Sequence, residues 1–167
     1  MELWDLYDQN CKPLGKTHIR GEKIPAGEYH IVVDIVSVNQ KNQLLITKRH
    51  PHKKFGNQWE TTGGSAVAGE KPAKAAQREL YEETGLKANE NELLYCGTLV
   101  RYSSRCIHIF YLYKGDFSAE DIVLQEGETI DFKLVNSRQL YQMVLEGDFL
   151  PFVYDRLKVI YNEYVDL

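Results

Sequence analysis

Hydrophobic residues along the chain gather in short runs that predict β-strands. The densest run, at 29–38, is rich in Ile and Val and indicates a buried strand. Polar turns separate it from shorter runs with the β-branched and aromatic composition of strands. We therefore expect further strands at 44–48, 59–62, 93–102, 106–113 and 129–135.

Three other segments have the pattern of helices. Residues 71–84 have Pro72 near their start, where it suits a first helical turn. Gly85 follows them and suits the C′ position, because a positive φ angle costs glycine little. A second helix is expected at 137–146, with its first serine as N-cap, and a third at 151–164. The irregular alternation of strands and helices favours one mixed α/β domain.

The length and the charge balance narrow the classes of protein that fit. A chain of 167 residues suits a single domain, expected to span 1–167, with a polar arm at 1–27 and helices within 137–167. Against 24 Asp and Glu there are 20 Lys and Arg, a net charge of −4. That balance argues against nucleic-acid binding, which needs a basic surface, but it permits a small anionic substrate.

The three cysteines, Cys11, Cys96 and Cys106, include no C-x-x-C pair, so we expect neither a disulfide framework nor a zinc site. Cys96 and Cys106 fall in predicted strands, where buried, inert thiols are expected. The amino terminus lacks a signal-peptide pattern, and no run approaches the ~20 apolar residues of a membrane span. These features predict a cytoplasmic protein without a membrane partner.

Three glutamates share one face of the helix expected at 71–84. At ~100° per residue, Glu82 and Glu83 fall within about 60° of Glu79, beside a narrow apolar stripe. Like charges at this spacing repel by about 0.2–0.5 kcal/mol per pair, and a cation between them would reverse that penalty. Mg²⁺ is the natural candidate, because it pairs one or two carboxylates with substrate phosphates. A solvated acidic face is the alternative.

The acidic helix belongs to a longer pattern over 64–86, G-x5-E-x7-R-E-U-x-E-E-x-G-U, in which U is a bulky apolar residue. The matching positions are Gly64, Glu70, Arg78, Glu79, Leu80, Glu82, Glu83, Gly85 and Leu86. This segment resembles the Nudix box of the Nudix hydrolase superfamily. The strand order around it and the aromatic and acidic start of the chain, at 3–8, are similar to members related to isopentenyl-diphosphate isomerase.

The resemblance implies an α/β fold, a Nudix-type α/β/α sandwich with a mixed β-sheet. It also implies a Mg²⁺-dependent hydrolase, with Mn²⁺ as a substitute, that cleaves the diphosphate linkage of a nucleoside diphosphate joined to another group, X. Glu79, Glu82 and Glu83 correspond to metal ligands, one of which can also assist as base. Gly64 would offer its backbone carbonyl to the metal.

Two further box residues have structural roles by the same resemblance. Arg78 would pair with Glu70 and brace the turn that leads into the helix. The expected chemistry agrees with the charges, because a diphosphate would be repelled by the acidic helix until divalent ions bridge carboxylates and phosphate oxygens.

Candidate residues also lie outside the box. In related Nudix proteins a loop acid completes the metal site or acts as base, and Glu128 is our first choice for it, Glu126 our second. A basic cluster at 48–54 precedes the box; within it Arg49 can clamp a phosphate in bidentate fashion, with Lys48 beside it. A solvated loop acid and a basic loop that contacts no ligand are the alternatives.

Aromatic and turn residues supply weaker candidates for substrate contacts. Tyr102 can stack on a base or another planar group, whereas core packing is favoured for Trp59. Arg20 and Glu22 are further candidates, although their pattern is more typical of a surface turn.

Two other functions stay open. An isopentenyl-diphosphate isomerase would need a cysteine in the strand before its metal helix, and residues 59–64 contain none. A Nudix domain that only senses a nucleotide often loses box acids, and all of them are present here. The expected partner is a small-molecule diphosphate, and a homodimer is compatible with this superfamily.

Overall fold

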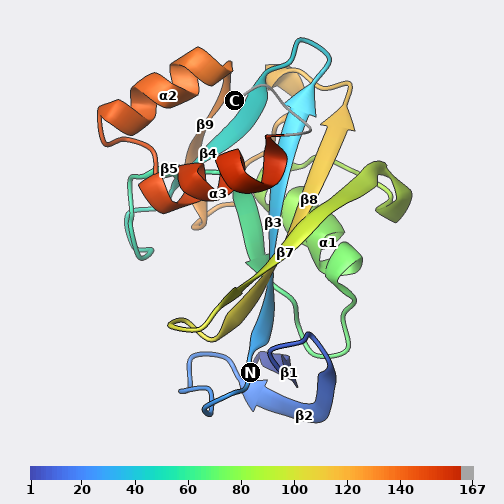
Figure 1. Cartoon of the computed structure of the whole chain (residues 1–167). Helices are drawn as coiled ribbons and strands as arrows, with labels where there is room; N and C mark the ends of the chain where they lie inside the picture. Colours follow the sequence, from blue (N-terminus) through green and yellow to red (C-terminus); the bar gives the residue numbers. More distant parts are fainter. Residues whose placement is uncertain (163–167) are drawn as a thin grey trace.

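A mixed β-sheet forms the centre of the molecule, of which the computed structural model describes residues 1–162. Its strands are β3 (His30–Asn39), β4 (Leu44–Arg49), β5 (Trp59–Glu60), β6 (Thr62–Ser65), β7 (Leu93–Arg101), β8 (Cys106–Gly115) and β9 (Thr129–Val135). They follow the order β5-β4-β3-β8-β7, with β6 paired to β3 and β9 to β4 (Figure 1). β3 and β8 run parallel, and the other pairs are antiparallel.

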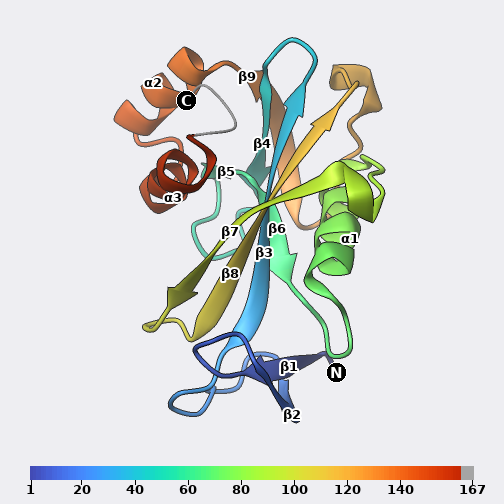
Figure 2. The same cartoon turned by 45° about the vertical axis from the view of Figure 1, so that its right-hand side comes forward.

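Helices cover both faces of this sheet. They are α1 (Pro72–Thr84), α2 (Ser137–Leu145) and α3 (Pro151–Tyr161), with short 3₁₀ turns at Glu90–Glu92 and Ala119–Asp121. Figure 2 shows α1 on one face and α2 and α3 on the other. The fold is therefore the expected α/β/α sandwich with a mixed sheet. Within residues 1–162 there is no helix whose length and apolar character would let it cross a membrane.

Alternation along the central strands divides the hydrophobic core into two layers. Ile31, Val33 and Ile35 of β3 pack toward α1, where Ala76 and Leu80 are fully buried. The second layer lies under α2 and α3 and includes Val36, Val38, Phe110, Leu112, Leu140 and Leu157. Because both faces of β3 are covered, its sequence is an almost continuous Ile and Val run.

Helix α1 has the ends that its sequence predicts. Pro72 occupies the first turn, and Lys71 before it provides no side-chain cap. Gly85 has a φ angle of 75°, and its N–H donates to the carbonyl of Tyr81 over 2.8 Å. The glycine therefore ends the helix in the left-handed conformation that other residues adopt only at a cost.

Other boundaries differ from the prediction. Asn136, and not Ser137, is the N-cap of α2, because its side chain and that of Gln139 form a reciprocal capping box. The run expected at 59–62 is divided between β5, which pairs with β4, and β6, which pairs with β3 and contains Gly63 and Gly64. The predicted third helix is described only to Tyr161, and the remainder of that prediction at 163–164 lies outside the described residues.

The predicted arm contains a hairpin of β1 (Leu3–Tyr7) and β2 (Pro13–Ile19), at the amino-terminal end of β3 (Figure 1). Tyr7 bridges to Tyr29, and Asp5 accepts a 2.7 Å hydrogen bond from the N–H of Gly69 in the loop before α1. The hairpin is thereby joined both to the sheet and to the loop that leads into the acidic helix.

Candidate functional site

The acidic face of α1 forms one wall of a polar cleft of about 220 Å³. Strand β6 places its backbone opposite this face, because β6 and α1 are joined by one short loop and pack together. Three loops close the cleft and contribute Arg20, Lys53 and Glu128. Carboxylates and cations thus meet in one small space.

Glu83 is the most deeply buried acid of the cleft, with 4% of its surface exposed. The N–H of Gly63 donates to its carboxylate over 3.4 Å, which is too long to offset the loss of hydration. Burial, reinforced by repulsion from Glu60, raises the pKa of Glu83 to about 8. A buried carboxylate of this kind fits a bound cation, which would replace the lost hydration.

Glu79 lies directly on the backbone of β6. A Cβ atom on Gly64 would stand 2.2 Å from the Glu79 carboxyl carbon, so a side chain at position 64 would displace the carboxylate. Burial raises the pKa of Glu79, and the ion pair with Arg78 opposes that rise. The absence of a side chain at Gly64 therefore leaves the Glu79 carboxylate beside the Gly64 backbone.

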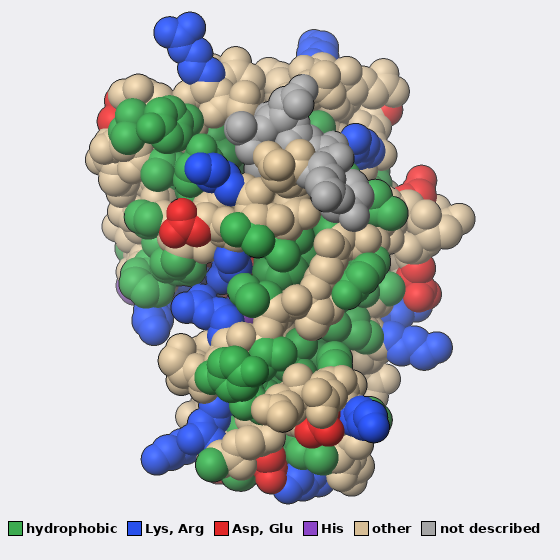
Figure 3. Space-filling view, in the orientation of Figure 1, with side chains coloured by type: hydrophobic (Ala, Val, Ile, Leu, Met, Phe, Trp, Pro, Cys, Tyr) green, Lys and Arg blue, Asp and Glu red, His purple; other side chains and the backbone are tan. Residues whose placement is uncertain are grey.

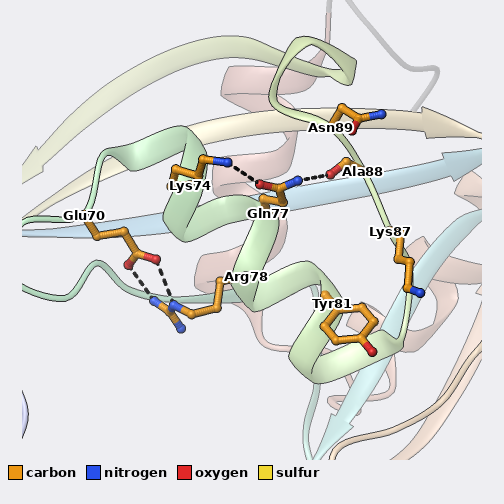
Figure 4. A pocket seen from close by; sticks show the side chains of 8 residues that line it. All are labelled: Glu70, Lys74, Gln77, Arg78, Tyr81, Lys87, Ala88 and Asn89. Atoms are coloured by element: carbon orange, nitrogen blue, oxygen red, sulfur yellow. Dashed lines mark hydrogen bonds and ion pairs between the residues drawn. The ribbon is translucent and has the colours of Figure 1, made fainter.

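Arg78 connects the carboxylates of the box through its guanidinium group. It donates to both Glu70 oxygens over 2.9 Å, as Figure 4 shows, and to the Ser65 carbonyl over 3.1 Å. Its Nη1 atom also bonds Glu79 over 2.7 Å and Glu82 over 3.1 Å. These hydrogen bonds anchor the loop to the helix and orient two of the cleft acids.

A larger cavity, of about 510 Å³, lies on another side of α1 and shares Arg78 with the cleft. Its walls include Glu70, Lys74 and Gln77, with hydrogen bonds from Lys74 to Gln77 and from Gln77 to the Ala88 carbonyl (Figure 4). None of the three clustered glutamates lines it. We therefore assign the chemistry to the smaller, acidic cleft.

The loop acid chosen from the sequence, Glu128, does line the cleft, and it forms an ion pair with Lys53. The second choice, Glu126, is not among the cleft residues. Besides Arg78, the cations Lys53 and Arg20 line the cleft. The sequence placed Lys53 in the basic cluster, and it offered Arg20 as a substrate contact while favouring a surface turn. Arg20 is held by Glu2, whose two carboxylate oxygens each accept a 2.9 Å hydrogen bond.

The structure does not bring the predicted substrate-binding residues into the cleft. Arg49 pairs with the buried Glu60 on the adjacent strand and bonds the Lys54 carbonyl. Lys48 lies over the ring of Trp59, which is buried in the core as expected. Tyr102 is 67% exposed on the turn after β7 and contacts Tyr29 edge-on.

Among residues 1–162, no three His, Cys, Asp or Glu side chains already converge as a metal-ligand cluster. Arg78 holds oxygens of Glu79 and Glu82, and Lys53 holds Glu128, so these acids point at cations of the protein itself. The oxygen-rich donor set and the buried Glu83 nevertheless fit a hard divalent cation, which would compete with these ion pairs.

Comparison with known proteins gives the family. A model of the NUDIX domain matches residues 28–153, which include every box residue. The chain belongs to the Nudix family. A Nudix hydrolase of Listeria monocytogenes is 35% identical to it over 159 residues, or 92% of this chain and 91% of the relative. This Nudix chain is accordingly a hydrolase of the pyrophosphohydrolase type.

Two further relatives match only part of this chain, and they belong to two different classes of enzyme. An isopentenyl-diphosphate Delta-isomerase of Pectobacterium atrosepticum is 38% identical over 49% of this chain and 46% of its own length. An RNA pyrophosphohydrolase of Bartonella bacilliformis is 38% identical over 36% of this chain and 38% of its own length. Among solved structures, DR0079 from Deinococcus radiodurans has a TM-score of 0.72 and 19% identity, covering 89% of this chain and 91% of that one, which shows a shared fold.

Proposed function

We propose that this Nudix hydrolase cleaves the diphosphate linkage of a nucleoside diphosphate joined to a group X, or of a similar organic diphosphate, with Mg²⁺ or Mn²⁺. The observation that carries the proposal is the buried Glu83 carboxylate beside Glu79, in a cleft that also holds Arg20 and Lys53. A cleft that contained only acids would repel a diphosphate. A cleft that bound phosphate through Lys and Arg alone would give no reason for a buried carboxylate.

The proposed ligands are Glu79, Glu82, Glu83 and the backbone carbonyl of Gly64. A divalent ion held there supplies charge that polarises a phosphoryl oxygen and lowers the pKa of a bound water. Burial of Glu79 and Glu83 strengthens their interaction with such an ion, because little water remains to screen it.

The protein's own cations and the loop acid carry the remaining roles. Lys53 and Arg20 lie on the walls of the cleft and can neutralise phosphate oxygens distant from the acids. Glu128 projects from the loop before β9 with 45% of its side chain exposed, and it is the proposed acceptor of the proton from the attacking water. Arg78 has a positioning role, since it fixes Glu79 and Glu82.

The deciding experiment is a screen of nucleotide sugars, dinucleotides, oxidised nucleotides and isoprenoid diphosphates with Mg²⁺, scored by phosphate or nucleotide release. We expect turnover that stops with a chelator and falls about 100-fold or more in Glu83→Gln. Glu126→Gln is the control, because it makes the same substitution at an acid outside the cleft. Unchanged turnover in Glu83→Gln would contradict the mechanism.

The other two functions make different predictions for the same protein. A nucleotide sensor would bind a diphosphate tightly in Mg²⁺ without turning it over. An isomerase would release isomerised product, and strands β5 and β6 carry no cysteine to support that chemistry. The hydrolase therefore remains the function that these residues favour.

Location and assembly complete the proposal. Three free thiols suit a reducing compartment, so we propose the cytoplasm. A single domain over 1–167 and a homodimer also remain proposals, and light scattering on the purified protein measures the second directly.

A further inference from the structure

A chain of hydrogen bonds outside the cleft links a cysteine, a histidine and an aspartate. The Cys106 sulfur lies 3.3 Å from Nε2 of His108, and Nδ1 of His108 lies 2.5 Å from Asp34 Oδ2. Cys106 and His108 are two residues apart on β8 and so project from the same face. Asp34 comes from the neighbouring parallel strand β3, where Val32 pairs with His108.

Two further contacts hold this chain in place. Arg156 of α3 donates to the second oxygen of Asp34 over 3.0 Å, which fixes the carboxylate. The hydroxyl of Ser104, in the turn before β8, lies 3.0 Å from the Cys106 sulfur. Cys106, His108 and Asp34 are thus arranged as a nucleophile, a base and an acid that orients the base. The same order of contacts activates nucleophilic side chains in enzymes.

The charges around the pair favour a thiolate. Burial alone would raise the pKa of Cys106, but hydrogen bonds from His108 and Ser104 lower it overall. Burial alone would lower the pKa of His108, but Asp34 and Cys106 raise it to about 9. The other titratable or charged groups that face the pair are His30 on β3, Arg101 on β7 and Arg156 on α3.

The remaining two cysteines lack such partners and provide internal controls. Burial raises the pKa of Cys96 to about 11, and burial also raises that of Cys11. Both are half-buried, whereas Cys106 is 5% exposed. Cys106 is buried as expected from the sequence, but its contacts are not those of an inert thiol, and Cys96 is less buried than expected.

A cleft of about 450 Å³ adjoins this chain of contacts on the side of the hairpin. Trp4, His30, Ser104 and Arg105 line it, and Ser104 is the residue that touches Cys106. His30 is 8% exposed, and its Nδ1 atom and Nη1 of Arg105 have no hydrogen-bond partner within the described residues. The wall of the cleft beside Ser104 therefore contains polar atoms that the protein itself leaves unsatisfied.

The cleft belongs to the half of the molecule that contains the hairpin. Figure 3 shows the face of the molecule on which α3 lies. The molecule is narrower between the hairpin and the part that carries α2 and α3, and Lys and Arg side chains lie at this narrow region. Arg101 and Arg156 both approach the ring of Phe152, at 5.8 and 5.5 Å. Arg101 is also the direct cross-strand neighbour of Cys106, so positive charge lies close to the thiol.

We propose that Cys106, His108 and Asp34 form a nucleophilic thiol site for small soft electrophiles, of which peroxides are the natural class. The thiolate sulfur attacks one peroxide oxygen, the S–O bond forms and the O–O bond breaks. The departing hydroxide takes the proton from the His108 imidazolium and leaves as water. Sulfur is oxidised to a sulfenic acid, and the peroxide is reduced.

The test uses the full-length protein with limiting hydrogen peroxide and a dimedone trap, and in parallel with limiting iodoacetamide. Peptide mass mapping then gives the rate at each cysteine. We expect Cys106 to react about tenfold faster at neutral pH than Cys11 or Cys96, although it is the least exposed. A rate at Cys106 no higher than at the other two would overturn the proposal.

Variants distinguish whether Cys106 reacts because His108 activates the thiol or because the thiol is exposed to solvent. His108→Gln should slow Cys106 by about tenfold, and Ser104→Ala, in an exposed turn, should slow it less. His52→Gln is the control, because His52 is exposed and lies outside this cleft. If His108→Gln does not fold, the wild-type pH profile decides: a rate already level at neutral pH supports the site, and a rate that rises until about pH 8.5 contradicts it.

Discussion

A Cβ atom at position 64 would lie 2.2 Å from the carboxyl carbon of Glu79, so the Glu79 carboxylate occupies the space that a side chain at position 64 would need. The contact is with the flexible end of a side chain. A larger residue at 64 is therefore expected to move the glutamate and leave the sheet in place.

Gly64→Ala is consequently expected to lower the hydrolase activity while leaving the stability of the fold almost unchanged. We expect kcat/KM for diphosphate hydrolysis to fall about 100-fold, because a displacement near 1 Å in a catalytic group has that effect. The free energy of unfolding should change by less than about 1 kcal/mol, since the Glu79 carboxylate can rotate away. Urea denaturation and steady-state kinetics on the same preparation measure both, and a large loss of stability with full activity would contradict this explanation.

Lys53→Ala tests the lysine that lines the cleft. We expect KM for a diphosphate substrate to rise about tenfold, because a charge-assisted hydrogen bond to phosphate is lost. Lys54→Ala is the matched control, since the Lys54 ammonium lies 5.1 Å from the ring of Phe55 and outside the cleft. Equal effects of the two substitutions would show that Lys53 acts only through the general charge of the loop.

Arg49→Gln tests a residue that the sequence suggested for substrate binding. Glu60 is buried beside it, and burial raises the pKa of Glu60 while Arg49 opposes that rise. Loss of the guanidinium leaves an uncompensated carboxylate, so stability should fall by about 2–3 kcal/mol. KM should remain within about twofold of the wild-type value. A raised KM without a loss of stability would contradict this prediction and indicate that Arg49 binds the substrate.

His30→Phe tests the pH dependence of stability. Burial, with repulsion from His108, lowers the pKa of His30 from 6.5 to about 4. Between pH 4 and 6.5 the unfolded chain binds a proton at His30 that the folded chain does not. The neutral, buried His30 is therefore compatible with full stability above pH 6.5, and stability is lost as the pH falls toward 4. Phenylalanine does not titrate and can retain the stack on Trp4, whose ring lies 3.9 Å away.

The stability of the His30→Phe variant should accordingly decline less steeply with acidification than that of the wild type. Urea denaturation across this pH interval measures the two slopes. His52→Phe serves as control, because it removes a histidine that is exposed. Parallel slopes for His30→Phe and wild type would show that His30 is protonated in the folded protein.

The sequence by itself determined the features that depend on local spacing. Glu79, Glu82 and Glu83 share a face because helical geometry sets their angles, and Gly85 ends the helix because of its own backbone freedom. The almost continuous Ile and Val run of β3 similarly indicated a strand buried on both faces. The α2 cap was missed by one residue, since Asn136 and Ser137 are both good caps and only the bond with Gln139 decides between them.

Tertiary structure alone decided which residues meet across distant segments. Arg49 is directed to Glu60 by the pairing of β4 with β5, and Lys53 from the following loop lines the acidic cleft instead. Asp34 and His108 are 74 residues apart, and they touch only because β3 and β8 are parallel neighbours in a fixed register. Long-range register depends on how whole strands pack, and local composition does not encode it for any single residue.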